Sequence, residues 1–145
     1  MTIRRMDRVG VVVDDLEAAV AFFVELGMER GGGGSVDGAW VDGVVGLENV
    51  RSDFAFVRTP DGHGQLELLQ FRSPPADTRE RNAPANALGI RHLTFAVDDI
   101  EDVLTRLRPH GAELVGRVEQ FENTFKLCYV RGPAGIIVEL AEEIG

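Results

Sequence analysis

The sequence contains few of the features that mark secreted, membrane-spanning or nucleic-acid-binding proteins. Its 145 residues include one cysteine, Cys128, so no disulfide forms within the chain, which fits a reducing, cytoplasmic location. No apolar run approaches the roughly 18 residues of a membrane span, and the N-terminal residues lack the apolar region of a signal peptide. The net charge is −9, and such an acidic chain is a poor ligand for phosphates. We therefore expect no membrane and no nucleic-acid partner.

The sequence contains an internal repeat, and its composition is that of an ordinary globular protein. Residues 8–17, RVGVVVDDLE, match residues 92–101, HLTFAVDDIE, at an offset of 84. Further on, RTPDG at 58–62 resembles RGPAG at 131–135, and LEL at 66–68 then falls on VEL at 138–140. Two matches in the same order indicate an internal duplication. We predict one domain over residues 1–145, with repeat one at about 5–72, a linker at about 73–88 and repeat two at about 89–145.

Each repeat has the pattern of a strand, a helix and three further strands. The first strands are expected at 5–13 and 90–97, and Asp14 and Asp98 are the predicted N-caps of the helices that follow. Gly27 and Gly111 stand where glycine ends a helix, and the run Gly31–Gly34 reads as a flexible turn. The remaining strands are expected at 28–36, 51–58 and 64–71 in repeat one, and at 112–118, 124–131 and 135–142 in repeat two.

The alternation of side chains along strands places four polar residues in equivalent positions. Bulky apolar residues occupy one face of each first strand, and Arg8 and His92 occupy the other face, among small residues. Glu67 and Glu139 are equivalent residues in the last strands, each between apolar neighbours, where a carboxylate is costly unless it is paired or bound to a cation. We expect these two related pairs to converge on a common centre.

The sequence resembles the vicinal oxygen chelate superfamily, which includes glyoxalases, methylmalonyl-CoA epimerase, extradiol dioxygenases and bleomycin-resistance proteins. The motifs that carry the resemblance are VDDLE at 13–17, FFVELG at 22–27, QLEL at 65–68, HLTFAVD at 92–98 and GIIVEL at 135–140. The resemblance covers nearly the whole chain. It implies an α+β fold in which two tandem βαβββ repeats form a curved mixed sheet around a central cavity. It also implies a small-molecule substrate or ligand, and a homodimer.

The resemblance further implies a divalent metal bound at the positions of Arg8, Glu67, His92 and Glu139. Glu67, His92 and Glu139 are competent ligands for Mn, Fe, Co, Ni, Mg or Zn, but the guanidinium of Arg8 has no lone pair to offer. If the metal is kept, it stabilises an enolate-like charge while Glu67 or Glu139 moves a proton, as in a glyoxalase-like lyase or an epimerase. Ring-cleaving dioxygenase chemistry is less favoured, because that group resembles a site of two histidines and one carboxylate.

The alternative is a protein without a metal, in which the charge of Arg8 replaces the cation. The site then serves as a binding pocket, as in drug-sequestering resistance proteins, or as a metal-free enzyme in which Arg8 holds a substrate oxygen. The aromatic residues are mostly expected in the core. Trp40, Phe54 and Tyr129 are those we expect to wall the pocket if they face it. The sequence leaves the metal-dependent and metal-free interpretations open, and does not identify the substrate.

Overall fold

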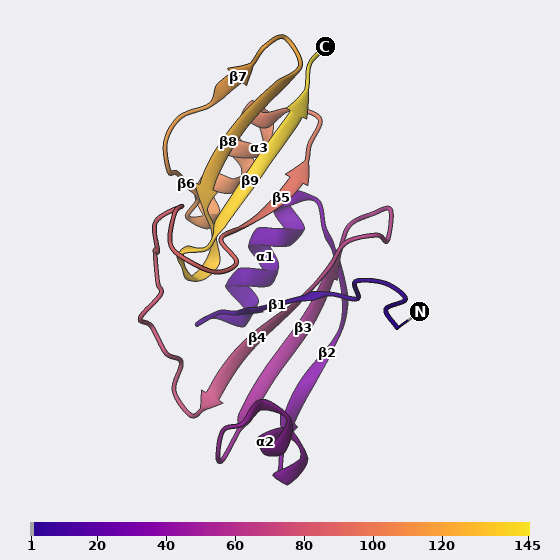
Figure 1. The fold of residues 1–145 in the computed structure, drawn as a ribbon, viewed down its shortest axis with the longest axis vertical. Coiled ribbons are helices and arrows are strands. Elements are labelled where there is room, and N and C mark those ends of the chain that lie inside the picture. Colours follow the sequence, from indigo (N-terminus) through magenta and orange to yellow (C-terminus); the bar gives the residue numbers. More distant parts are fainter. Residues whose placement is uncertain (1) are drawn as a thin grey trace. The chain divides into compact units, whose positions relative to one another are not determined.

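The computed structural model describes residues 2–145 and consists of two compact units. Unit 1 ends at Asp77 and unit 2 comprises Thr78–Gly145, so the boundary falls inside the predicted linker at 73–88. Each unit contains one sheet and helices, which confirms the predicted α+β class (Figure 1). Within residues 2–145, no helix combines the length and the apolarity that crossing a bilayer requires.

Unit 1 is a four-stranded mixed sheet with two helices. The strand order is β1 (Val9–Val12), β4 (Gln65–Ser73), β3 (Arg51–Arg58) and β2 (Glu29–Asp37), with β1 parallel to β4 and the other pairs antiparallel. Helix α1 (Leu16–Leu26) connects β1 to β2, and α2 (Ala39–Val45) connects β2 to β3.

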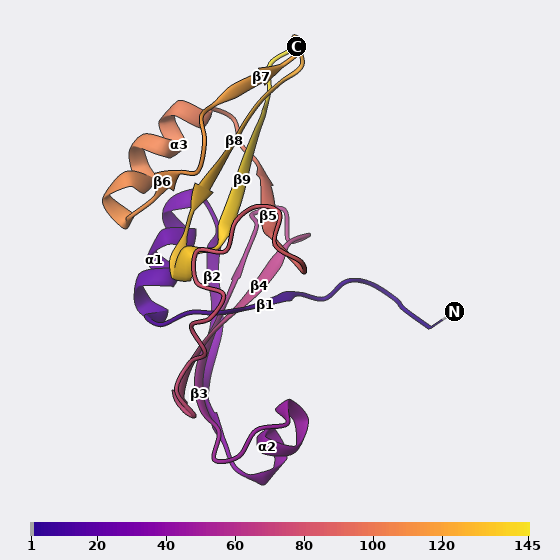
Figure 2. The ribbon, with the colours of Figure 1, turned by 60° about the vertical axis from the view of Figure 1, so that its left-hand side comes forward.

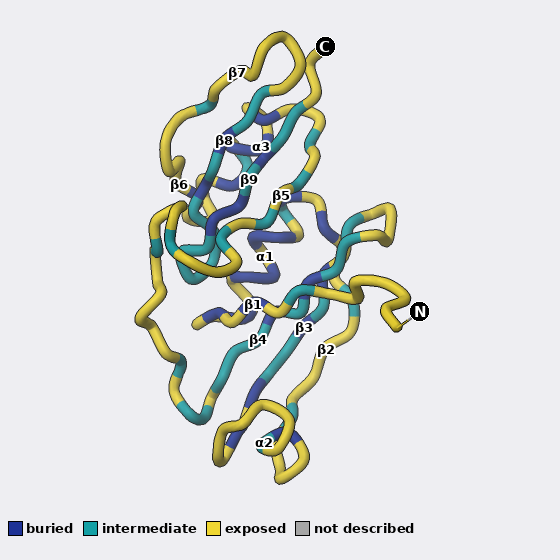
Figure 3. The backbone as a smooth tube through the Cα atoms, viewed as in Figure 1, coloured by how far each residue is buried: buried dark blue, intermediate teal, exposed yellow. Residues whose placement is uncertain are grey.

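The core of unit 1 lies between α1 and one face of this sheet (Figure 2). The inward side of α1 is buried along its whole length, as the tube coloured by burial shows (Figure 3). The buried residues are Leu16, Ala19, Val20, Phe22, Phe23 and Leu26 of α1 and Val11, Ala55, Val57, Leu66 and Leu68 of the strands. Each fully buried large apolar side chain contributes roughly 1.5–3 kcal/mol relative to exposure. The intervening strand residues, Glu67 among them, therefore point to the other face.

Unit 2 repeats this arrangement with a divided second strand. It contains β5 (His92–Ala96), α3 (Ile100–Leu107), η1 (Arg108–His110), β6 (Glu113–Leu114), β7 (Glu119–Phe121), β8 (Phe125–Arg131), η2 (Pro133–Gly135) and β9 (Ile137–Glu143). The strand order is β5, β9, β8 and β6, and β7 also pairs with β8. The short strands β6 and β7 together occupy the place that β2 has in unit 1.

The register of the strands confirms the duplication residue by residue. In unit 1 Gly10 lies opposite Glu67 on parallel strands, and in unit 2 Thr94 lies opposite Glu139 in the same way. These pairs are related by the offset of 84 in the first strand and by 72 in the last. The sequence comparison therefore aligned the two repeats correctly.

Both main helices begin one residue later than predicted. The N-caps are Asp15, which accepts a hydrogen bond from the backbone N–H of Ala18 at 3.1 Å, and Asp99, which accepts from that of Asp102 at 3.2 Å. Asp14 and Asp98 were therefore the wrong N-caps. The reason is that sheet pairing continues one residue beyond each first strand, since the N–H of Val13 donates to the carbonyl of Leu69 at 2.8 Å.

Three further expectations were wrong. Gly31–Gly34 lies inside β2 and is not a turn, and a Cβ at Gly33 would lie 2.7 Å from the carbonyl oxygen of Phe54, so close strand packing requires glycine there. Helix α2 was not predicted, and its Trp40 is 63% exposed. Phe121 and Phe125 pair with each other across β7 and β8 and are exposed, although aromatic residues were mostly expected in the core.

Candidate functional site

Each unit brings its two predicted polar residues together on the sheet face away from the main helix. In unit 1 these are Arg8, directly before β1, and Glu67 in β4. In unit 2 they are His92 in β5 and Glu139 in β9. The structure therefore brings one member of each equivalent pair together within each repeat. Whether the two pairs share one centre stays a prediction.

Arg8 is held by two carboxylates. Its Nε donates a hydrogen bond to Oε1 of Glu67 at 3.1 Å, and its Nη1 donates to Oδ2 of Asp7 at 2.7 Å. The guanidinium carbon also lies 5.4 Å from the ring centre of Phe56, a cation–π arrangement. The hydrogen bonds that Arg8 donates, first to Glu67 and then to Asp7, raise the pKa of Arg8, so its positive charge is permanent.

The same contacts act on Asp7 in the opposite direction. Hydrogen bonds from Arg8 and then from Arg5 lower the pKa of the Asp7 carboxyl, which therefore stays ionised near neutral pH. Arg8 consequently has two negative neighbours and Asp7 has two positive ones, so the charges of Arg5, Asp7, Arg8 and Glu67 sum to zero. Glu67, whose side chain is 21% exposed, obtains from Arg8 the positive partner that its apolar strand requires.

His92 and Glu139 are arranged differently. Nε2 of His92 lies 3.5 Å from Oε1 of Glu139, and the hydroxyl of Thr94 donates to the same oxygen at 2.7 Å. The hydroxyl of Tyr129 lies 3.5 Å from Nδ1 of His92, and the two rings are 5.1 Å apart and tilted by 34°. All four side chains come from neighbouring strands of unit 2.

Sequence reasoning did not assign Thr94 or Phe56 to the site. Phe56 lies directly across from Glu67 on β3, as Tyr129 lies across from Glu139 on β8, so the two aromatic residues are equivalent. The available signals were the alternation that puts Thr94 beside His92 on one strand, and the offset of 73 that relates Phe56 to Tyr129. The structure thus adds one aromatic residue to unit 1 and one hydroxyl to unit 2.

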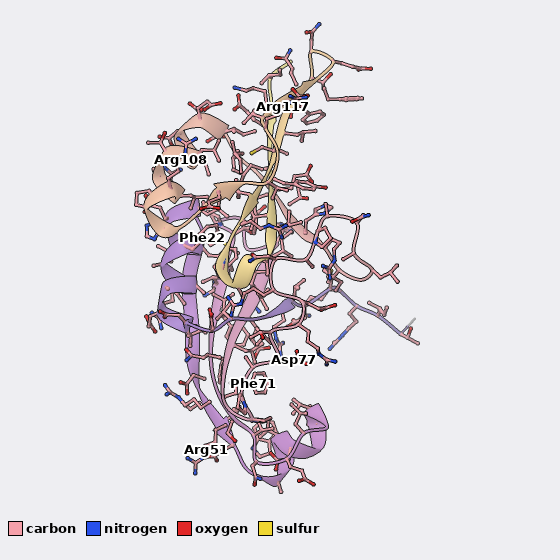
Figure 4. The ribbon with its side chains drawn as sticks, turned by 90° about the vertical axis from the view of Figure 1, so that its left-hand side faces the viewer. Phe22, Arg51, Phe71, Asp77, Arg108 and Arg117 are labelled. Carbon is pink, nitrogen blue, oxygen red and sulfur yellow. The ribbon has the colours of Figure 1, made fainter. Side chains whose placement is uncertain are left out.

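The remaining predicted pocket residues differ in how far their side chains are buried. Phe54 is half-buried on β3 with its ring 5.5 Å from that of Phe56, and Tyr129 is half-buried beside His92. Trp40, by contrast, stands on the exposed helix α2. Figure 4 shows Phe71 of β4 on the sheet face opposite α1. The substrate-binding roles of Trp40, Phe54 and Tyr129 stay predictions.

The donor set fits a metal ion in one half only. A cation at Glu67 would meet the fixed charge of Arg8, which already bonds to that carboxylate, so the positions of unit 1 do not fit. His92 and Glu139 do fit as two donors, since an ion about 2.1 Å from each can bridge atoms 3.5 Å apart. Neither unit, over residues 2–145, gathers three His, Cys, Asp or Glu side chains by itself. The predicted ligand set of Glu67, His92 and Glu139 draws on both units and stays a prediction.

The single cysteine is not part of this arrangement. Cys128 is 4% exposed in β8, and burial is the main cause that raises the pKa of its thiol. A neutral, buried thiol is a poor nucleophile. Cys128 is therefore a core residue.

Known proteins share both the sequence pattern and the fold. Residues 7–130 match the family model described as the glyoxalase/bleomycin resistance protein/dioxygenase superfamily. A glyoxalase family protein from Bacillus cereus is 46% identical, with a TM-score of 0.95 over 100% of this chain and 97% of that chain. The uncharacterized protein YaeR of Escherichia coli K12 is 32% identical over 57% of this chain, which spans 61% of YaeR. The uncharacterized protein YwbC of Bacillus subtilis 168 is 25% identical over 94% of this chain and 95% of its own length.

Proposed function

Because the chain belongs to the glyoxalase/bleomycin resistance protein/dioxygenase superfamily, we propose that it binds a small organic molecule without a resident metal ion. The observation that carries this proposal is the 3.1 Å hydrogen bond from Nε of Arg8 to Oε1 of Glu67. Arg8 occupies a position that the resemblance assigns to a metal ligand, and its permanent charge supplies what a cation would supply to Glu67. The pair is complete within the protein and needs no ion.

The charges of unit 1 also bear on the ligand. Arg8 already binds Asp7 and Glu67, so an anionic ligand would have to compete with two carboxylates for its guanidinium. From the sequence alone, Arg8 was also a candidate for binding a substrate carboxylate. The contacts favour instead a neutral or positively charged ligand, with Arg8 acting mainly as the partner of Glu67.

A metal-dependent lyase or epimerase is the second candidate. It is favoured by one observation, the spacing of His92 Nε2 and Glu139 Oε1, which suits a shared ion. A metal ion at this position would polarise a substrate oxygen and stabilise an enolate-like charge. Glu139 or Glu67 would then be the proton-transferring carboxylate.

Metal analysis separates the two candidates. We expect protein purified without an affinity tag to contain far less than one transition metal ion per chain, before and after incubation with Mn²⁺, Ni²⁺ or Zn²⁺. Arg8→His replaces the guanidinium with an imidazole ligand and should raise metal affinity by at least about tenfold. Arg8→Gln removes the same charge without adding a strong ligand, and serves as the matched control.

The opposite result would be near-stoichiometric metal in the wild-type protein that disappears in Glu139→Gln. It would overturn the metal-free proposal and support the lyase or epimerase. The melting temperature of each variant, measured first, shows that a loss of metal is not a loss of fold.

A further inference from the structure

The two half-sites differ in how their carboxylates are compensated. Glu67 has Arg8, whereas Glu139 contacts no arginine or lysine side chain among residues 78–145. The side chain of Glu139 is nevertheless only 19% exposed. A carboxylate shielded to this extent is costly unless a positive group approaches it. Glu139 is therefore the position in unit 2 where a positive charge is missing.

The neighbours of Glu139 hold the carboxylate without a permanent positive charge. The hydroxyl of Thr94 donates to Oε1 at 2.7 Å, a strong hydrogen bond that fixes the side chain. Nε2 of His92 faces the same oxygen at 3.5 Å, which is longer than the 2.7–2.9 Å typical of a charge-assisted hydrogen bond. Within unit 2 the other oxygen, Oε2, accepts no hydrogen bond from residues 78–145. The carboxylate is thus oriented and still able to take a partner.

Two aromatic rings adjoin this carboxylate. Tyr129 is the direct cross-strand neighbour of Glu139, and its ring lies 5.1 Å from the ring of His92. Aromatic rings near a carboxylate are typical of sites for organic ammonium groups, whose polarised C–H groups pack on the rings while the charge faces the acid. The equivalent positions of unit 1 lack this combination, because Arg8 already lies over the ring of Phe56.

We propose that unit 2 anchors the ligand through an organic ammonium group, which binds Glu139 and packs against the rings of Tyr129 and His92. The inference rests on the proposed function and names the chemical class of its ligand. Thr94 is a positioning residue that holds Glu139 for this contact. The net charge of −9 favours the approach of a cationic molecule.

A pair of isosteric probes tests the charge. Choline carries a quaternary ammonium group, and 3,3-dimethyl-1-butanol has the same shape with carbon in place of nitrogen. Dissociation constants are measured for both by NMR titration of the isotope-labelled full chain, in buffer with EDTA so that no metal competes for Glu139. We expect choline to bind at least about tenfold more tightly, the size of one charge-assisted contact.

Variants of unit 2 test the assignment to residues. Glu139→Gln should weaken choline binding at least about tenfold, whereas Glu143→Gln, with the same change of charge on the same strand, should leave it within about twofold. Tyr129→Leu should weaken binding and Tyr129→Phe should not, because the ring face makes the contact. Thr94→Val should weaken binding about threefold and Thr94→Ser should restore it.

Equal affinity for the two probes, or a Glu139→Gln protein that binds choline like the wild type, would overturn the inference. Failure of the proposed function looks different, since it appears as bound metal in the wild-type protein before EDTA is added. Comparison of the amide spectra shows whether any variant has lost its fold. If Glu139→Gln does not fold, the Tyr129 pair and the two probes on the wild type decide the result.

Discussion

Single substitutions at equivalent positions give the two repeats different chemistry. Where unit 2 has His92, Thr94 and Tyr129 around its carboxylate, unit 1 has Arg8, Gly10 and Phe56 around Glu67. Each replacement in unit 1 removes a group that can both donate and accept a hydrogen bond. The duplicated backbone thus carries a closed ion pair in one half and an unneutralised carboxylate in the other.

Asp7 offers a direct measurement of the Arg8 ion pair. Hydrogen bonding to Arg8 is the main cause that lowers the pKa of Asp7. The pair therefore stabilises the fold at pH values above the ordinary pKa of aspartate, and this stabilisation is lost as the pH falls through the lowered pKa. Arg8→Gln should therefore raise the titration midpoint of the Asp7 carboxyl in a ¹³C NMR titration. Asp61, whose pKa is lowered mainly by Thr59, is the internal control and should not change. A midpoint of Asp7 that stays in place would show that Arg8 is not its partner.

At the residue scale, alternation along strands and the duplication placed Arg8, Glu67, His92 and Glu139 at equivalent positions, and the structure adds that Arg8 meets Glu67 and His92 meets Glu139. It was not enough to find Phe56 or Thr94 as members of the site. Their positions depend on cross-strand register and on a hydroxyl rotamer, which an isolated sequence does not specify. The same limit leaves the roles of Trp40 and Phe54 as predictions.

At the scale of elements, strand positions were predicted within a few residues because apolar alternation in this chain is strong. Helix α2 was missed because it is short, contains Gly43 and buries only Val41, so it has almost no apolar periodicity. The second strand of repeat two was predicted as one segment, whereas β6 and β7 are separate. The start of each helix was missed by one residue because two consecutive aspartates offer equivalent caps, and sheet pairing selects the second.

The choice between these aspartates can be measured. Asp99→Ala removes the hydrogen bond to the N–H of Asp102 and should lower the free energy of unfolding by about 1 kcal/mol. Asp98→Ala changes an adjacent, exposed aspartate that does not cap α3, and should change the free energy of unfolding by less than about 0.5 kcal/mol. Urea denaturation of both variants measures the difference. A larger loss in Asp98→Ala would contradict the observed cap.

At the scale of the whole molecule, the duplication was the most informative feature of the sequence. It predicted that both units share one succession of strands and helix, because two copies of one pattern are expected to fold alike. The homodimer and the cytoplasmic location that we expected stay predictions, as does the central cavity. The homodimer and the cavity depend on how compact units pack together, which the pattern of a single repeat does not encode.

Cys128 reports on the integrity of unit 2. Because burial keeps its thiol neutral and covered, we expect labelling of the native protein by a disulfide reagent at pH 8 to be at least about a hundredfold slower than labelling in urea. The labelling rate should rise with urea concentration along the unfolding curve of this unit. Rapid labelling of the native protein would mean that β8 opens far more often than its buried position indicates.

The positive charge of Arg8, unlike that of a bound metal ion, does not depend on the supply of metal in the cell. A metal cofactor is in equilibrium with a cellular pool, so its occupancy falls during starvation and the wrong ion can be loaded in its place. The charge of Arg8 is attached to the backbone and is present once per chain as soon as unit 1 folds. Neither a chelator nor a competing ion can remove it.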